Sequence, residues 1–357
     1  MDPQSQFCAN EACRDKGRCG AGNIRIHSRQ EHRYRCTTCG ATFAATRGTP
    51  YFRLRSSAAL VTLVVTLLCH GCPLQAIVAA FGLDERTVAT WWERAGAHCQ
   101  RLHAHLVQTG QVELEQVQAD ELWVKLAGQR VWQAMALAVP SRLWLGGVIS
   151  PHRDLVLIRT LIRQVRTCGR TLAVLVCVDG LASYVRAVRE GFRESVHTGR
   201  RGRPRLVQPA GLLLAQVVKH TRKRHLVGVT RRVVIGTLGA VQQVLAATGT
   251  GTQINTAYIE RLNATFRACL APLARRSRCI LHRPPLLTAA MYLVGMAYNF
   301  CWPHESLQER TPAMAAGLTD HGWTLHELLS YRIPPALWVA PKRRGRPPKP
   351  RPAGQAA

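Results

Sequence analysis

Negative charge is what this sequence has least of. The 357 residues include 20 Asp and Glu against 48 Lys and Arg, which gives a net charge of +28 and a pI near 10.9. Self-repulsion of this size requires a counter-charge, and the usual counter-charge for such a chain is nucleic acid. The composition therefore predicts nucleic acid as the partner, with an anionic membrane as the next candidate.

Long apolar runs are also missing, although 47% of the residues are hydrophobic and can supply two or three domains with a core. The longest run, residues 58–69, is shorter than the roughly 20 residues that a membrane-spanning helix needs. The N-terminus lacks the basic start and apolar stretch of a secretory signal. We therefore expect a cytoplasmic, nucleoid-associated protein without a membrane partner.

Cysteine, in contrast, is abundant and is paired near the N-terminus. A C-x4-C pair and a C-x2-C pair lie within residues 1–55, and 13 Cys in an unexported chain favour metal ligands or buried thiols over disulfides. Two thiolate pairs on tight turns can close a tetrahedral zinc site, so we predict a structural zinc ribbon. Its ligands would be Cys8, Cys13, Cys36 and Cys39. Cys19 could replace Cys13, and a set of free thiols is the alternative.

Residues 56–108 have apolar side chains at helical spacing. Gly71 is predicted to end a first helix, Pro73 to open a second and Asp84 to cap a third. This pattern fits a helix-turn-helix DNA-binding domain, and a plain helical linker is the alternative. The third helix would bring to DNA Arg86, Thr87 and Thr90.

Three acids in the middle of the chain stand at chemically informative positions. Asp120 lies in the alternating run "LEQVQADELW", and Asp179 ends the apolar run "TLAVLVCVD". A buried strand that ends in Asp presents a carboxylate at a sheet edge, where ligands gather. Glu260 lies in a helical segment and is the only acid between Ser195 and His304.

Three converging carboxylates would repel one another unless cations lie between them. Two magnesium or manganese ions about 3.5–4 Å apart, held by carboxylate oxygens, are the usual device for phosphodiester chemistry. Asp120, Asp179 and Glu260 are therefore the predicted catalytic metal ligands. The alternative is that Glu260 only pairs with Arg261 or Arg267 on a solvated helix face.

Basic segments surround these acids. The Arg-, Gly- and Pro-rich segment at about 195–212 indicates a basic insertion, and residues 336–357 are too rich in Pro and Arg to pack, so we expect disorder there. Arg-Gly-Arg-Pro in this tail could lie in a narrow minor groove, or the tail could simply be solvated. Predicted DNA contacts outside the helix-turn-helix are Arg222, Lys223, Arg224, Arg267, Arg275, Arg276 and Arg346.

An ordered set of motifs resembles bacterial insertion-sequence transposases of the insertion-sequence-one-like family. The motifs are "TRGTPYFRLR", "QADELW", "CVDGLASY", "INTAYIERLNATFR", "LARRSRC" and "AYNFCWPHESL", behind the cysteine pairs. The resemblance implies a multidomain α/β protein whose residues 109–335 form a ribonuclease-H-like mixed-sheet core. It implies a DDE triad of Asp120 on the first strand, Asp179 on the fourth strand and Glu260 on a helix.

The same resemblance implies an activity: binding of the element's terminal inverted repeats, DNA cleavage, and joining of 3′-hydroxyl ends to target DNA with two magnesium ions. A homo-oligomer is expected by analogy, because two DNA ends must be brought together. Two details stay open: strand alternation should turn Glu121 away from Asp120, and Asn255 could stand in the third position. Alternative functions are a DNA-binding regulator without catalysis, or a nuclease on the same core.

Overall fold

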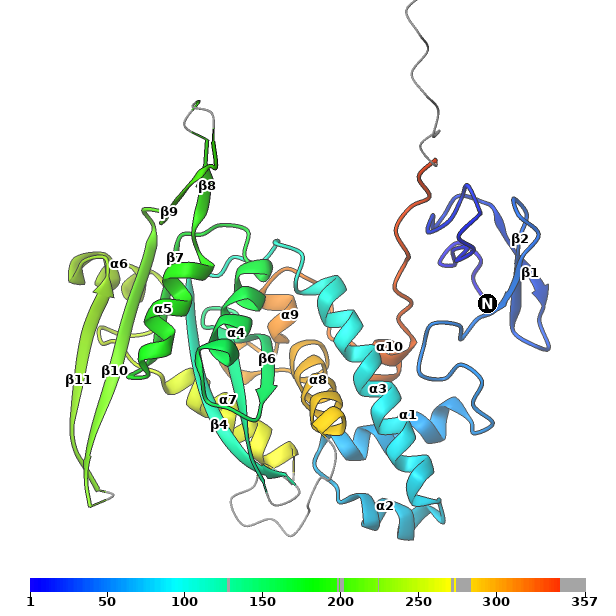
Figure 1. The fold of residues 1–357 in the computed structure, drawn as a ribbon. Helices are drawn as coiled ribbons and strands as arrows, with labels where there is room; N and C mark the ends of the chain where they lie inside the picture. The colour runs from blue at the N-terminus through cyan, green and yellow to red at the C-terminus, as the bar shows by residue number, and fades with distance from the viewer. Residues whose placement is uncertain are drawn as a thin grey trace, which may run out of the picture. The chain divides into compact units, whose positions relative to one another are not determined.

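The chain divides into two compact units. The computed structural model describes residues 1–126, 129–197, 199, 202–223, 225–270, 273 and 284–340 (Figure 1). The smaller unit comprises Met1–Gly48 with the residues from Arg332 onward, and the larger comprises Thr49–Tyr331. The predicted division at residue 108 lies inside the larger unit, because the helices before it pack on the elements after it.

The smaller unit contains a three-stranded antiparallel sheet. Its strands are β1 (Ile24–Ser28), β2 (Arg33–Cys36) and β3 (Thr42–Ala44). The Tyr34 and Phe43 rings stack across β2 and β3 with centroids 5.9 Å apart, and the Arg332 guanidinium lies 5.2 Å from the Phe43 ring. Four cysteines complete this small core.

The larger unit begins with three helices, α1 (Ala58–Cys69), α2 (Leu74–Phe81) and α3 (Glu85–Leu106). The predicted N-cap of α3 is confirmed, because the Asp84 carboxylate accepts hydrogen bonds from the Arg86 and Thr87 amides at 2.9 and 3.2 Å. Gly82 ends α2 in a left-handed conformation with φ 61°, which glycine adopts without strain.

A six-stranded mixed sheet follows, in the order β11-β10-β7-β4-β5-β6. Strands β4 to β6 are antiparallel, β7 is parallel to β4, β10 is parallel to β7, and β11 is antiparallel to β10. The bounds are β4 (Gln116–Leu126), β5 (Gln129–Ala138), β6 (Leu143–Ser150), β7 (Val174–Asp179), β10 (Leu212–Arg222) and β11 (His225–Ile235). The chain is therefore a mixed α/β protein.

Helices cover both faces of this sheet (Figure 1). One face carries α4 and α5, and the other carries α6 and α7, while α8 packs between β6 and α3. The bounds are α4 (Leu155–Cys168), α5 (Ala182–Gly191), α6 (Leu238–Ala247), α7 (Ala257–Cys269), α8 (Pro284–Phe300), α9 (Pro312–Ala315) and α10 (Leu325–Ser330). A 3-10 turn at Glu305–Leu307 precedes α9.

The predicted basic insertion interrupts the chain between α5 and β10. Its described residues include β8 (Glu194–Val196) and β9 (Arg205–Val207), which pair with each other as a separate two-stranded sheet. Of the predicted disordered tail, residues 336–340 lie outside helices and strands, and 341–357 lie outside the described residues. No described helix combines the length and apolar character needed to cross a bilayer.

The contact between α3 and α8 depends on a glycine and gives a first prediction. A methyl group at Gly96 of α3 would lie 2.2 Å from the Ala289 carbonyl oxygen of α8, so the two helices would have to separate. Gly96→Ala should lower the free energy of unfolding by about 1–3 kcal/mol, as measured by urea denaturation. Gly239→Ala in α6 is the control, because a methyl group there meets nothing within 4 Å. Equal stability of the two variants would contradict this packing.

Candidate functional site

Two carboxylates meet where the strand β7 ends beside its parallel neighbour β4. Asp120 lies on β4, the first strand of this sheet in chain order, and Asp179 is the last residue of β7, the fourth strand. The β4–β7 pairing runs through Ala119 and Val178, which brings the two acids to the same level. Oxygens of Asp120, Glu121 and Asp179 all lie within 4.8 Å of one another.

Glu121 reaches this group from the other face of the sheet. Alternation does place it opposite Asp120, and the Tyr184 hydroxyl of α5 donates to its Oε2 at 2.9 Å. Because β7 ends at Asp179, its pairing with β4 stops before Glu121, and the carboxylate still approaches the two aspartates. The prediction that alternation keeps Glu121 away from the site is therefore wrong.

Helix α7 is held against β4 by a buried glutamine. The Gln118 Oε1 accepts hydrogen bonds from the Tyr258 and Ile259 amides, both at 3.0 Å, in the first turn of α7. One turn further along, the Asn263 amide donates to Asp120 Oδ2 at 2.8 Å. Gln118 and Asp120 alternate on β4, so one face of this strand fixes the position of the helix that carries Glu260.

Glu260 lines the same cleft as the two aspartates without joining their close group. The cleft has a volume of about 510 Å³ and is lined by residues that include Asp120, Asp179 and Glu260. The Glu260 Oε1 accepts hydrogen bonds from Lys219 at 2.6 Å and from Thr256 at 2.9 Å. Glu260 therefore pairs with Lys219 of β10 and not with Arg261 or Arg267.

Arg153, which precedes α4, brings positive charge to the acids. Its guanidinium donates to Glu121 Oε1 at 2.5 Å and to Asp179 Oδ2 at 3.1 Å. Burial, together with the charges of Glu121 and Asp179, raises the pKa of Asp120 to about 7. Near neutral pH, Asp120 therefore exchanges its proton readily for other positive charge.

The donor set fits a hard divalent cation. The cluster offers carboxylate oxygens, which magnesium and manganese prefer. Burial first, and the neighbouring carboxylates second, raise the pKa of Asp120, so added positive charge would stabilise its ionised form. Asn255, the alternative third residue, is used elsewhere: its Oδ1 accepts hydrogen bonds from Gln118 at 3.1 Å and from the Ala257 amide at 3.2 Å. It helps to start α7 and does not line the cleft.

Sequence reasoning missed three residues of this site: Glu121, Arg153 and Gln118. The alternating "QVQAD" contained a signal for Gln118, since amides on one side of an apolar strand require buried partners. Arg153 had no such signal, because its partners lie on two strands distant in sequence.

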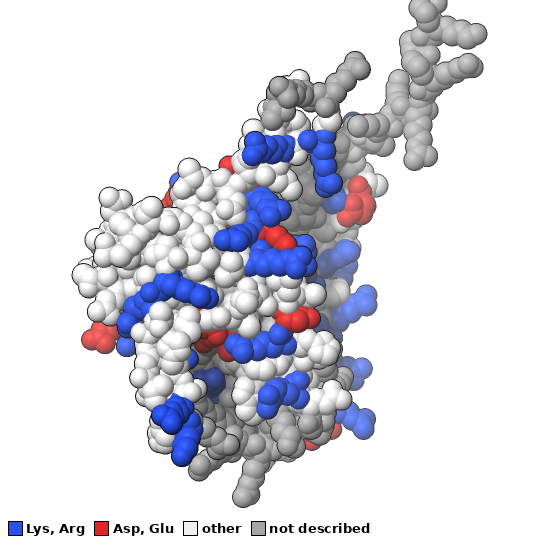
Figure 2. All heavy atoms as spheres, turned by 60° about the vertical axis from the view of Figure 1, so that its left-hand side comes forward, with Lys and Arg blue, Asp and Glu red and all other residues white. Residues whose placement is uncertain are grey.

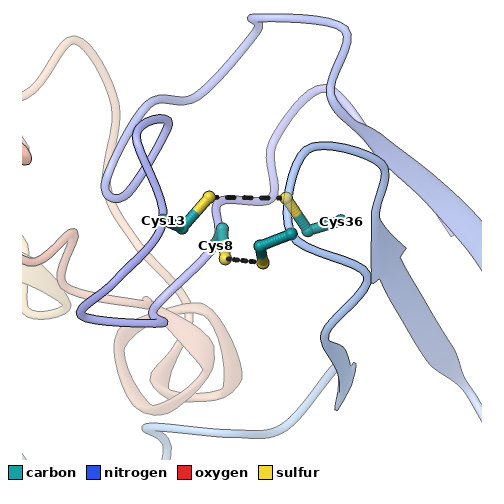
Figure 3. Close-up of side chains that lie close together, drawn as sticks. Cys8, Cys13 and Cys36 are labelled. Carbon is teal, nitrogen blue, oxygen red and sulfur yellow. Dashed lines mark hydrogen bonds between the residues drawn. The ribbon is translucent and has the colours of Figure 1, made fainter.

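The four predicted cysteines do form one cluster in the smaller unit (Figure 3). Sulfur atoms of Cys8 and Cys39 lie 3.6 Å apart, those of Cys13 and Cys36 lie 3.8 Å apart, and all four lie within 4.8 Å of one another. Burial opposes ionisation of Cys39, but the Ala41 amide and Asn10 lower the pKa of its thiol to about 7. Cys19 is exposed, so Cys13 is the fourth member of the cluster.

The predicted DNA contacts lie in varied settings. Arg86 and Thr90 are exposed at the start of α3, and Thr87 is half-buried beside them. Arg222 and Lys223 are exposed at the end of β10, whereas Arg267 is half-buried on α7. Outside the described residues lie Arg224, Arg275, Arg276 and Arg346. Figure 2 shows the β10–β11 side, where basic side chains are spread over the surface with a few acidic ones among them.

Neither the known protein families nor the curated proteins yield a match for this chain.

The cysteine cluster gives a second prediction, concerning zinc as its occupant. Cys36→Ser removes one of four thiolates, so zinc bound by the purified protein should fall from about one ion per chain to a small fraction of that. Metal content is measured by mass spectrometry after dialysis. Cys19→Ser, at an exposed cysteine outside the cluster, should retain the metal. Full zinc content in the Cys36 variant would rule out the site.

The two glutamates beside the aspartates give a third prediction. Glu260 faces the cleft and is 46% exposed, whereas the Glu121 side chain is fully buried with donors on both oxygens. The exposed Lys219 pair is weak, so Glu260 can exchange Lys219 for a cation at little cost. Glu260→Gln should therefore weaken manganese binding more than Glu121→Gln, as measured by calorimetry. A larger loss in the Glu121 variant would make Glu121 the third ligand.

Proposed function

We propose that this chain is a divalent-metal-dependent phosphoryl transferase that acts on DNA. Within that class, we propose a DDE transposase of the insertion-sequence-one-like type. It would bind the terminal inverted repeats of its element, cleave the DNA and join the 3′-hydroxyl ends to target DNA. The observation that carries the proposal is the cleft that Asp120, Asp179 and Glu260 line together, in a chain of net charge +28.

The order of elements supports the ribonuclease-H-like assignment that the resemblance implies. Asp120 belongs to the first strand of the sheet, Asp179 to the fourth strand, and Glu260 to a helix packed on the first strand. The antiparallel strands β4 to β6 are followed by the parallel strands β7 and β10. These are the placements expected for a DDE triad.

Asp120, Asp179 and Glu260 would hold the two magnesium or manganese ions. Such ions activate the attacking hydroxyl and stabilise the leaving oxygen of a phosphodiester. The protein contributes positioning. Asn263 orients the Asp120 carboxylate, and Arg153 fixes Asp179 from the opposite side. Lys219 lines the cleft beside Glu260, and its ammonium group would bind a phosphate of the DNA strand.

The remaining parts of the chain support binding to DNA ends. The exposed start of α3 presents Arg86 and Thr90, as a helix-turn-helix recognition helix would. In the smaller unit, the cysteine cluster would be a structural zinc ribbon that fixes the turns around β2. Both features add affinity for DNA without taking part in the chemistry.

Loss of one cleft aspartate gives the fourth prediction. Asp179→Ala should abolish joining of labelled terminal-repeat DNA in magnesium, while affinity for the ends changes by no more than about tenfold, or about 1.4 kcal/mol. Asp320→Ala is the control, because this aspartate is 93% exposed and lies outside the cleft. Joined products are resolved by gel electrophoresis, and affinity is measured by fluorescence anisotropy.

The same assay separates the competing functions. Joined products from the unaltered protein support a transposase, cuts without joining indicate a nuclease, and binding without either indicates a regulator. Loss of both binding and joining in the Asp179 variant would mean that this residue is structural.

A further inference from the structure

Strands β10 and β11 continue beyond the sheet as a two-stranded arm, which we define as residues 218–232. β10 pairs with β7 only as far as Val217, and among the described strands β11 alone pairs with the residues beyond it. Side chains at successive arm positions, such as Lys219 and His220, are exposed although they point to opposite faces. Toward the turn, residues 219–223 and 225–227 are all exposed.

The arm is basic along its length. The sequence of residues 218–232 contains no Asp or Glu. Exposed cations stand near its end at Arg222 and Lys223 and near its base at Arg231 and Arg232. A surface of one sign this dense is complementary to a phosphate backbone.

Apolar side chains stand beside these charges. Leu226 is 60% exposed and Val227 is 63% exposed, both on β11 close to the turn. An isolated two-stranded ribbon is marginally stable in water, and exposed Leu and Val make an uncovered arm still less favourable. The arm therefore has the character of an element that a partner covers.

The geometry points to the major groove of duplex DNA as the place where this arm binds. That the partner is DNA rests on the proposed function. Paired strands lie about 4.8 Å apart, and the major groove, about 12 Å wide, admits a two-stranded ribbon. Basic side chains would reach phosphates on both sides, and whichever of Leu226 and Val227 lies on the inserted face would meet base edges such as thymine methyl groups, because the two alternate faces of the strand.

The base of the arm is fixed to the cleft. Arg231 donates to the Ile254 carbonyl at 2.9 Å, just before α7, and Arg232 donates to Gln216 Oε1 at 2.8 Å. Lys219 leaves the arm on the α7 side and bonds Glu260. A duplex held by the arm would thus continue directly into the cleft, so the arm sets which phosphate arrives there.

The test uses full-length protein and a fluorescein-labelled mixed-sequence duplex. The arm variant carries Arg222→Ser and Lys223→Asn, where Asn suits the positive φ of 46° at residue 223. The control variant carries Arg163→Ser and Arg189→Ser, which remove the same charge from exposed positions on α4 and α5. Binding is measured over a range of salt concentrations. The arm variant should lower the slope of log K against log salt by about 1.8, because two phosphate contacts are lost.

Groove occupancy is measured in parallel by dimethyl sulfate, which methylates guanine N7 in the major groove. At saturating concentrations, the unaltered protein and the control variant should protect N7, and the arm variant should not. Equal slopes and equal protection in the two variants would overturn the inference while leaving the proposed activity intact. A loss of protection confined to the arm variant, in a protein that neither cuts nor joins DNA, would support the arm and contradict the transposase. Absence of DNA binding by the unaltered protein would overturn both.

Discussion

The hydrogen bonds from the first turn of α7 to Gln118 are the interaction on which the arrangement of the site depends. Gln118 is completely buried, and its side-chain oxygen accepts hydrogen bonds from two backbone amides of α7. Amides in the first turn of a helix have no acceptor within the helix itself. Since Gln118 and Asp120 share one face of β4, this contact fixes Asn263 and Glu260 relative to the aspartates. Loss of the glutamine would leave buried amides without acceptors, at a cost of about 1–3 kcal/mol.

Electrostatics explains why so basic a chain keeps acids in this cleft. Burial and mutual repulsion raise the pKa of Asp120 to about 7, and Arg153 and Lys219 compensate part of the remaining charge. Both cations contact carboxylates from partly exposed positions, where such pairs are exchangeable. The acidic group can therefore accept more positive charge.

One strand serves two purposes. The first half of β10, Leu212–Val217, is buried between β7 and β11 and is apolar apart from Gln216, whereas the second half, from Lys219 onward, is polar and exposed. The hydrophobic half fixes the register against Asp179, and the exposed half extends from that fixed base. A cleft residue such as Lys219 stands at the transition, which couples the proposed DNA arm to the acids.

Several local features of this protein were predictable from the sequence. Cysteine spacing predicted the cluster of Cys8, Cys13, Cys36 and Cys39, and Asp84 was predicted as a cap. An alternating run predicted Asp120 on a strand, and an apolar run ending in an acid predicted Asp179 at the end of a strand. These features depend on neighbours within a few residues, or on the general rule that strands bury apolar side chains.

Which distant residues meet depends on the packing of the whole fold. Glu121 approaches the aspartates because β7 happens to end beside it, and Arg153 and Lys219 reach the acids from other elements. Strand order and register set these contacts, and both depend on how the whole sheet packs. Period-2 alternation assigned Glu121 to the correct face but carried no information about where the neighbouring strand stops.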